Sequence, residues 1–148
     1  MKPPEPFENY LKRGTVRKIA PDKARAEFLV NESDTSFKGL KERLGDRDIN
    51  ENNANSIIKD CHDIIIEIIR ARMLIDGYMA SGLNAHEAEV SYMKNVGFND
   101  KDVSFVNELR YFRNSATYYG KILDTGYAKK VVDFLINNHH NIRRIVNL

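Results

Sequence analysis

The sequence has little of what would cross-link a chain or anchor it in a membrane. Cys61 is the only cysteine among 148 residues, so no disulfide can form within them, and we expect a reducing compartment. The N-terminal residues lack the apolar core of a signal peptide. The longest apolar stretch, residues 64–75, is interrupted by Glu67, Arg70 and Arg72, and it is too short and too charged to span a bilayer. These absences predict a cytoplasmic protein with no membrane segment.

The sequence also lacks an excess of charge of one sign. It has 23 Lys and Arg against 21 Asp and Glu, which gives a net charge of +2. The isoelectric point of about 8.6 permits contact with nucleic acid but falls short of the basic excess of dedicated binders. Any electrostatic preference for a partner must therefore come from the local distribution of charge.

The motifs of several common enzyme classes and metal sites are missing as well. There is no P-loop, no GxGxxG fingerprint and no nucleophile elbow. His139 and His140 are adjacent, whereas metal-binding helices place two histidines four residues apart. His62 follows Cys61 directly, and neighbouring positions on a helix point in different directions, so the sequence selects no Cys–His pair. We expect no metal and no other cofactor.

Helical periodicity runs along nearly the whole chain, and no strand pattern of period two appears. We predict main helices at residues 21–44, 53–81, 99–123 and 127–146, with short helices at 7–12 and 84–96. No repeat or linker divides the chain. Residues 1–148 are therefore expected to form one all-α domain, an up-down bundle of four main helices with one or two short extra helices. Residues 1–20 would be an N-terminal extension of this bundle.

For two of these helices the sequence also predicts which side chains are buried. The helix at 53–81 is rich in isoleucine on more than one face, which is typical of the centre of a bundle or of a subunit interface. Its apolar surface exceeds what one short bundle needs, so we predict a homodimer. For the helix at 21–44, the predicted inward face consists of Ala24, Phe28, Phe37, Leu40 and Leu44.

The helix at 99–123 places several polar side chains together beside its apolar stripe. On a helical wheel they are Arg110, Arg113, Asn114, Thr117 and Lys121, with Tyr118 at the far edge. Arginine offers forked donors that suit phosphate, and Asn and Thr add neutral hydrogen bonds to sugar or phosphate. This pattern predicts a face that binds a nucleic acid or a nucleotide. The alternative is a solvated face with salt bridges to acidic residues of a neighbouring helix.

The segment Arg113-Asn-Ser-Ala-Thr-Tyr118, late in the penultimate helix, resembles the signature of the HEPN superfamily. That signature is an arginine, usually followed by a polar residue, with a histidine several positions later. The order of helices over residues 20–146 is also similar to that family. An opening helix is followed by a long apolar helix, a short helical segment and then the helix with the motif. The resemblance implies a HEPN-like bundle and a homodimer in which two motifs face each other.

In catalytic members of the family the arginine and histidine act together in metal-independent RNA cleavage. Here Thr117 and Tyr118 stand where the histidine would fall. Tyrosine, with an ordinary pKa near 10, is a poor base at neutral pH. The resemblance therefore implies an RNA- or nucleotide-binding component of a prokaryotic toxin–antitoxin or nucleotidyltransferase-associated system, with altered catalysis and with Arg113 and Tyr118 at the catalytic positions.

Two other functions stay open at this point. One is an active metal-independent ribonuclease. The other is a purely structural helical interaction module that partners a nucleotidyltransferase, with the chemistry carried out by that partner.

Overall fold

Helices make up most of the computed structural model, which describes residues 1–45, 47–118 and 124–148, without the side chains of residues 116–118. In chain order the elements are α1 (Phe7–Lys12), β1 (Val16–Lys18), α2 (Lys23–Gly45), α3 (Ala54–Asp76), β2 (Tyr78–Ala80), α4 (Ala85–Asn95), α5 (Asp100–Tyr118) and α6 (Thr125–Arg143). Helix accounts for 71% and strand for 4%, which confirms the predicted all-α class. Within the described ranges, no helix has an apolar run long enough to cross a membrane.

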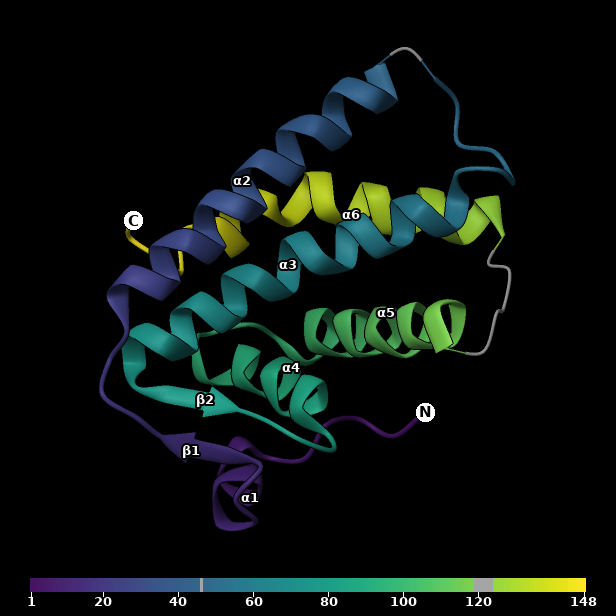
Figure 1. Ribbon diagram of the computed structural model, residues 1–148. Coiled ribbons are helices and arrows are strands. Elements are labelled where there is room, and N and C mark those ends of the chain that lie inside the picture. Colours follow the sequence, from purple (N-terminus) through teal and green to yellow (C-terminus); the bar gives the residue numbers. More distant parts are fainter. Residues whose placement is uncertain (46, 119–123) are drawn as a thin grey trace.

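Helix α3 lies at the centre of the bundle, in contact with α2, α4, α5 and α6 (Figure 1). Its apolar side chains are buried within the single chain, among them Ile57, Ile58, Ile64, Ile65, Ile66, Ile68, Ile69, Met73 and Leu74. The expectation that this isoleucine-rich helix lies at the centre of a bundle is therefore confirmed. Because the other helices cover this surface, α3 leaves none of the exposed apolar surface from which the homodimer was predicted. The packing of α3 therefore gives no reason to expect a homodimer.

The inward face of α2 differs from the predicted one in its first half. Phe28 is 62% exposed and Ala24 is also exposed. The buried or half-buried stripe consists of Ala26, Val30, Ser33, Phe37, Leu40 and Leu44, at spacings of three and four residues. The prediction placed the largest apolar side chain inside, whereas a single continuous helical stripe determines which face packs on α3. Ser33 fits this stripe because its hydroxyl donates a hydrogen bond to Ile64 O at 2.7 Å.

The predicted helix at 53–81 ends five residues early, and a strand follows it. Gly77 caps α3 in the left-handed conformation, with φ of 86°. A Cβ at this position would lie 2.9 Å from Ile19 O, so both the backbone angle and the close approach require glycine. After this turn, Tyr78–Ala80 pairs antiparallel with Val16–Lys18. The expectation of no strands was wrong because three-residue strands are too short to show a period.

The other predicted helices agree with the structure to within a few residues. Helices α1 and α4 lie at or within one residue of their predicted bounds. Helix α6 begins slightly earlier than predicted, because the side chain of Asp124 accepts a hydrogen bond from Tyr127 N at 2.7 Å and so caps its first turn. Helix α5 is described as far as Tyr118, and the predicted continuation at 119–123 lies outside the described residues.

Residues 1–20, expected as an extension, pack against the bundle through α1 and β1. Phe7 and Tyr10 are buried. The Phe7 ring contacts the rings of Tyr78 and Tyr92, with centroids 5.2 Å and 4.6 Å away. The N-terminal segment is therefore tied to β2 and α4 by an aromatic cluster.

The buried position of Cys61 on α3 generates a first prediction. Burial, with a contribution from the carboxylate of Asp60, raises the pKa of the thiol to about 12, so it is not a thiolate at neutral pH. We expect Cys61→Ser to lower the free energy of unfolding by about 1–3 kcal/mol, because a hydroxyl is then buried without an assured partner. Urea unfolding measures this, with Cys61→Ala as the control that adds no polar atom. Loss of ligand binding in a folded Cys61→Ser protein would contradict the structural role of this thiol.

Candidate functional site

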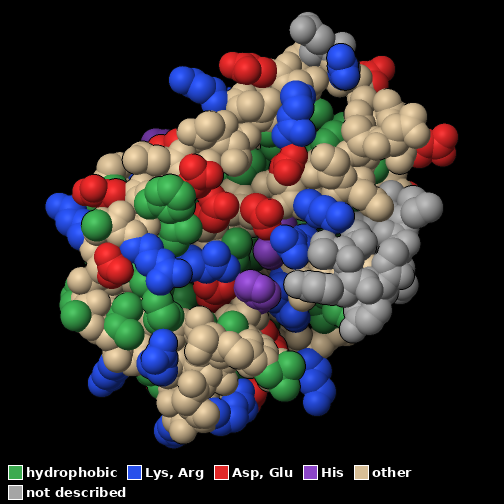
Figure 2. All heavy atoms as spheres, viewed as in Figure 1, with side chains coloured by type: hydrophobic (Ala, Val, Ile, Leu, Met, Phe, Trp, Pro, Cys, Tyr) green, Lys and Arg blue, Asp and Glu red, His purple; other side chains and the backbone are tan. Residues whose placement is uncertain are grey.

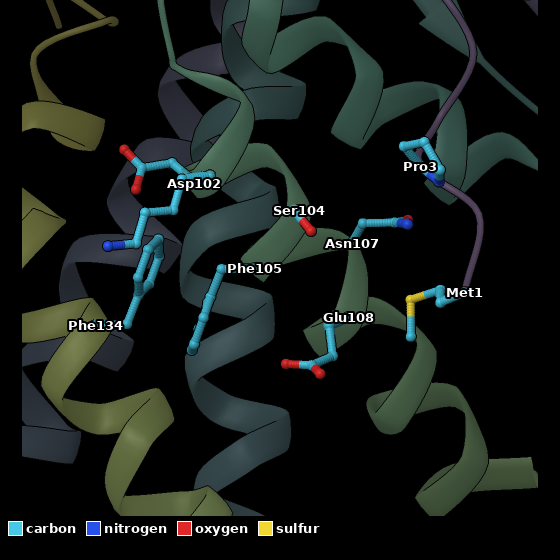
Figure 3. Close-up of a pocket in the computed structure, with 9 residues that line it drawn as sticks. Met1, Pro3, Asp102, Ser104, Phe105, Asn107, Glu108 and Phe134 are labelled. Atoms are coloured by element: carbon cyan, nitrogen blue, oxygen red, sulfur yellow. The ribbon is translucent and has the colours of Figure 1, made fainter.

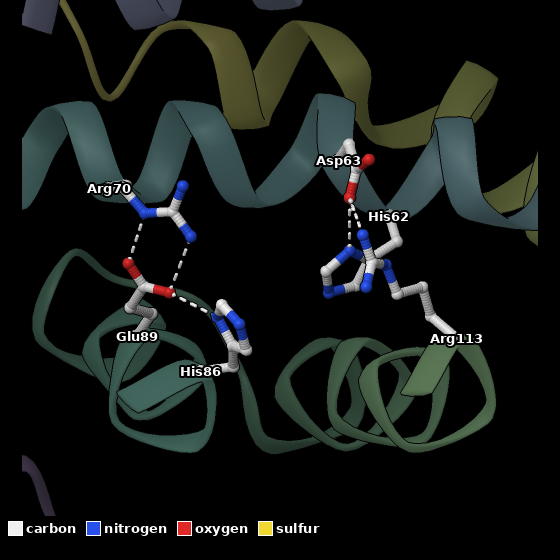
Figure 4. A network of polar contacts seen from close by, with 6 residues as sticks. All are labelled: His62, Asp63, Arg70, His86, Glu89 and Arg113. Carbon is white, nitrogen blue, oxygen red and sulfur yellow. Dashed lines mark hydrogen bonds and ion pairs between the residues drawn. The ribbon is translucent and has the colours of Figure 1, made fainter. Parts of the chain in front are cut away.

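The two arginines of the predicted phosphate-binding face on α5 do not lie together. Arg110 donates from Nε to Asn107 Oδ1 at 3.0 Å. Asn107 is itself buried and donates to Lys2 O at 2.9 Å. Arg110 is thus held by α5 and the N-terminal segment, whereas Arg113 points toward α3 (Figure 4). The structure therefore divides the arc that the helical wheel placed on one face.

The remaining members of that predicted face are only partly described. Asn114 is half-buried on α5. The backbones of Thr117 and Tyr118 belong to the last turn of α5, but their side chains lie outside the described part of the chain. Lys121 lies outside the described residues altogether.

Arg113 joins His62 and Asp63 of α3 in a group that we name the His62 cluster. Arg113 Nη2 lies 3.5 Å from Asp63 Oδ1, and His62 Nδ1 lies 2.9 Å from the same oxygen. His62 is 4% exposed, and the side chain of Arg113 is 23% exposed. Side chains at consecutive helix positions point about 100° apart, but the imidazole of His62 still reaches the carboxylate of Asp63, the next residue.

A second cluster of the same composition, the His86 cluster, lies farther along α3. Arg70 of α3 donates from Nε and Nη2 to Glu89 of α4, at 2.5 Å and 3.0 Å. His86 Nδ1, also on α4, lies 3.0 Å from Glu89 Oε1. The carboxylate of Glu89 is buried, while the side chain of His86 is 48% exposed. Each cluster is therefore a histidine whose Nδ1 meets a carboxylate that also meets an arginine.

Both clusters line one cleft between α3, α4 and α5. The cleft has a volume of about 220 Å³ and is lined by His62, Asp63, Ile66, Glu67, Arg70, His86 and Arg113. Figure 2 shows histidine side chains near the middle of this face, with acidic and basic side chains around them. From one end of the cleft to the other, Figure 4 shows Arg70, His86, His62 and Arg113.

The protonation states within the His62 cluster follow from its burial. Burial lowers the pKa of His62, and the contact with Asp63 does not offset this, so the ring is neutral at pH 7. Burial opposes ionisation of Asp63, but the hydrogen bond from His62 and the charge of Arg113 hold its pKa below its usual value. An ionised carboxylate only accepts, so Nδ1 of His62 carries the hydrogen and Nε2 carries the lone pair. Within the described part of the chain, this buried Nε2 has no hydrogen-bond partner.

The His86 cluster contains an ion pair between Arg70 of α3 and Glu89 of α4. Burial opposes ionisation of Glu89, but hydrogen bonds with His86 and Arg70 outweigh it and lower its pKa. The hydrogen bonds to Glu89 in turn raise the pKa of Arg70 above its already high ordinary value. Glu89 and Arg70 are both ionised, and Glu89 fixes the ring of His86 through Nδ1.

Glu67 adds a group that titrates near neutral pH. Burial, together with the carboxylates of Asp63 and Glu32, raises its pKa to about 7, against the opposing effect of Arg70. Its buried Oε2 has no hydrogen-bond partner among the described residues. When Glu67 is protonated, the two arginines and the two ionised carboxylates of the cleft balance in charge.

The cleft therefore combines a neutral imidazole, a second imidazole open to solvent, a carboxyl group that titrates near pH 7 and two guanidinium groups. This set can transfer protons and can hold an anion at Arg113, and perturbed groups of this kind gather at functional sites. Among the residues that the structure describes, no three or more His, Cys, Asp or Glu side chains are grouped to hold a metal ion.

Two larger cavities lie along the N-terminal segment. One, of about 450 Å³, lies between Met1, Pro3 and α5, with Phe134 of α6 stacked on Phe105 at 4.2 Å (Figure 3). The other, of about 630 Å³, lies between residues 3–8 and helices α4 and α5. Neither lining, as described, includes a histidine or an arginine. Two further cavities, of about 280 Å³ and 240 Å³, include arginine but no histidine in their described lining. The cleft of about 220 Å³ brings two histidines together with two arginines, and it is therefore the candidate site.

Most of the cleft was not predicted from the sequence. Of its lining residues, only Arg113 belonged to the predicted site, and His62 was set aside because it adjoins Cys61. One signal was present: Asp63, Glu67 and Arg70 recur at four and three residues within the isoleucine-rich part of the helix. Such spacing puts three charged side chains on one face, where a buried helix must provide them with partners.

Comparison with known proteins assigns no family to this chain. The chain matches no protein-family model, no curated protein and no solved structure. What the cleft can do therefore has to follow from its own residues and from the motif on α5.

The raised pKa of Glu67 predicts a pH-dependent stability. The folded state binds the proton of Glu67 more tightly than the unfolded state, whose pKa is near 4.5, so its ionisation destabilises the fold as pH rises toward about 7. Glu67→Gln removes this loss. We expect the variant to gain about 1 kcal/mol over the wild type at about pH 8 and little at about pH 4, a figure reduced for solvent screening of a half-buried group.

Urea unfolding at the two pH values measures this difference. Glu42→Gln is the matched control, because Glu42 is exposed on α2 and does not line the cleft. Equal effects of Glu67→Gln at both pH values would contradict the raised pKa.

Proposed function

We propose that this chain is a HEPN-like domain that binds RNA or a nucleotide through phosphate in the cleft between α3, α4 and α5. It would serve as a component of a prokaryotic toxin–antitoxin or nucleotidyltransferase-associated system. The observation that carries this proposal is the position of Arg113, the arginine of the motif-like segment. It lines the cleft beside two histidines, whereas Arg110 is held by Asn107 of α5.

The guanidinium of Arg113 has donors to spare for a phosphate. Its contact with Asp63 is a single ion pair of 3.5 Å, longer than a charge-assisted hydrogen bond. Within the described residues, its buried Nε has no hydrogen-bond partner. A guanidinium held this loosely keeps a fork of donors that matches two phosphate oxygens.

The roles of the other motif residues follow from the resemblance. Asn114 would orient the phosphate or the sugar, Thr117 would add a neutral hydrogen bond, and Arg110 and Lys121 would widen the positive field. Tyr118 would occupy the place of the family's histidine. The homodimer with two facing motifs belongs to this proposal through the resemblance alone.

One observation favours the second function, a structural module that partners a nucleotidyltransferase. Each arginine of the cleft already faces a carboxylate, Asp63 or Glu89, so the cleft carries no surplus of positive charge. Paired charges of this kind also occur as purely structural networks. A binding experiment separates the two functions.

We expect Arg113→Ala to weaken the binding of labelled single-stranded RNA by about 5- to 150-fold, the equivalent of about 1–3 kcal/mol for a charge-assisted contact. Binding of the wild type should also weaken as salt rises, because each neutralised phosphate releases counterions. Fluorescence anisotropy at a series of salt concentrations measures both effects. Arg113→Lys, which keeps the charge but not the fork, should have an intermediate affinity.

Arg43→Ala is the matched control. Arg43 pairs with Asp60 on the surface between α2 and α3, away from the cleft, so its loss should leave the affinity unchanged. Arg110→Ala tests whether the surface extends along α5. If wild-type protein binds neither RNA nor ATP at low salt, the interaction-module function replaces the proposed one.

A further inference from the structure

The N-terminal part of the chain carries a group of exposed cations that the cleft does not use. Residues 12–25 contain six Lys and Arg side chains against the single acidic residue Asp22, whereas the whole chain has a net charge of only +2. All six are exposed, namely Lys12, Arg13, Arg17, Lys18, Lys23 and Arg25. Arg13 pairs with Glu5, but the described residues offer no ion pair to Arg17 or Arg25. Unpaired cations gathered in a chain of nearly balanced charge attract a polyanion.

The cavity of about 280 Å³ lies between these cations and the cleft. Its described lining includes Arg25 of α2, Arg70 of α3 and Met79 of β2. Arg70 also lines the cleft, so the cavity and the cleft are neighbours. Arg17 of β1 borders the cavity, because its Nη2 lies 3.4 Å from Met79 Sδ. Figure 2 shows basic side chains beside the histidines of this face. An RNA strand whose phosphate meets Arg113 in the cleft therefore finds two further arginines beyond Arg70.

The exposed ring of Phe28 lies on α2, between the cavity and the cleft. Arg25, Phe28 and Glu32 are three and four residues apart, so they share one face of the helix. Arg25 lines the cavity. Burial, together with the carboxylates of Asp63 and Glu32, raises the pKa of Glu67, so Glu32 lies within electrostatic reach of the cleft. Phe28 is 62% exposed, more than any other aromatic side chain that the structure describes. Its position makes it a platform on which a base can stack.

We propose that single-stranded RNA continues from the cleft along this face, with a base stacked on Phe28 and phosphates against Arg25 and Arg17. The inference rests on the proposed function, since Arg113 holds the strand at its other end. It adds an RNA surface on α2 and β1, outside the motif-like segment of α5. The RNA is single-stranded here because the bases of a duplex are already stacked on one another and have no free face for the ring.

The charges around Phe28 set the path of the RNA backbone. Glu32, one turn farther along α2, is exposed and repels phosphate, whereas Arg25 on the other side of the ring attracts it. The phosphates therefore pass on the Arg25 side. Stacking on an aromatic ring uses the face that every base has, so the surface should bind RNA with little preference for sequence.

An acidic protein segment is the alternative partner of the same cations. Such a segment would place its carboxylates against Arg25 and Arg17, but it gains no more from an aromatic ring than from an aliphatic side chain of similar size. The wall that the cavity shares with the cleft favours RNA, because one strand can then contact Arg113 and Arg25 together.

The test measures the affinity of a labelled oligouridylate of about 16 nucleotides by fluorescence anisotropy. We expect Phe28→Ala to weaken binding by about 5- to 150-fold, the range for loss of one stacked base. Phe28→Leu keeps an apolar side chain without a π face and should bind as weakly, whereas Phe28→Trp should bind at least as tightly as the wild type. The affinity for duplex RNA should not change in any of these variants. Because the side chain of Phe28 is exposed, each variant should fold.

Arg25→Ala and Arg17→Ala test the phosphate contacts. Each change should lower the slope of log affinity against log salt concentration by about 1, because each removes the release of about one counterion. The matched controls lie on α6, where Lys130 is an exposed cation and Ile136 an exposed apolar residue. Lys130→Ala and Ile136→Ala should change neither the slope nor the affinity.

The outcomes separate this inference from the proposed function. If Arg113→Ala weakens oligouridylate binding while Phe28→Ala and Arg25→Ala do not, the inference is overturned and the proposed function stands. Equal binding by wild type and Phe28→Leu also overturns it. Polyglutamate that displaces the oligouridylate as effectively as unlabelled RNA of equal charge indicates the acidic protein partner and overturns it as well.

Two further outcomes concern the cleft itself. If Phe28→Ala weakens binding and Arg113→Ala does not, the proposed phosphate site fails, and the path that leads from it fails too. If the wild type binds no RNA, the proposed function and the inference are both overturned.

Discussion

The structure depends on one constraint, the burial of the apolar side chains of α3 among four other helices. Four helices cover it, and its isoleucines and other apolar side chains form the middle of the core. A helix placed this way cannot leave a charge unpartnered, because an isolated buried charge costs several kcal/mol. Asp63 accordingly meets Arg113 of α5, and Arg70 meets Glu89 of α4. Glu67 has a buried Oε2 with no partner among the described residues, and it holds its proton up to about pH 7. The position of the cleft is a consequence of this requirement.

The same constraint sets the protonation states in the cleft. Burial keeps His62 neutral, while its contacts keep Asp63 ionised. Burial, together with the carboxylates of Asp63 and Glu32, outweighs the charge of Arg70 and raises the pKa of Glu67 to about 7, so Glu67 holds its proton up to that pH. Two carboxyl groups that would both be ionised in water at pH 7 therefore differ here, since Asp63 stays ionised while Glu67 holds its proton up to about pH 7.

The sequence predicted elements well where the signal is local. Spacing and caps located most helix ends to within a few residues, and the isoleucine-rich helix lies at the centre, one of the two placements that its composition predicted. Features that depend on contacts distant in sequence were missed. The β1–β2 pair joins two segments of three residues, the face of α2 is set by α3 and not by the size of Phe28, and Arg113 turns toward α3 because Asp63 is there. For the same reason the site residue on α5 was found, but its partners on α3 and α4 were not.

The pairing of β1 with β2 also orders the events of folding. The two strands are separated by the whole of α2 and α3, so pairing Val16 with Ala80 closes a longer loop than docking α2 on α3 does. Contacts close in sequence form sooner than distant ones, and the α2–α3 pair is therefore the earlier unit. Synthesis on a ribosome, by contrast, begins with the N-terminal residues. Phe7 leaves it first, yet one of the aromatic rings that bury it, that of Tyr92, lies on α4. The first segment to be synthesised is thus among the last to find its place.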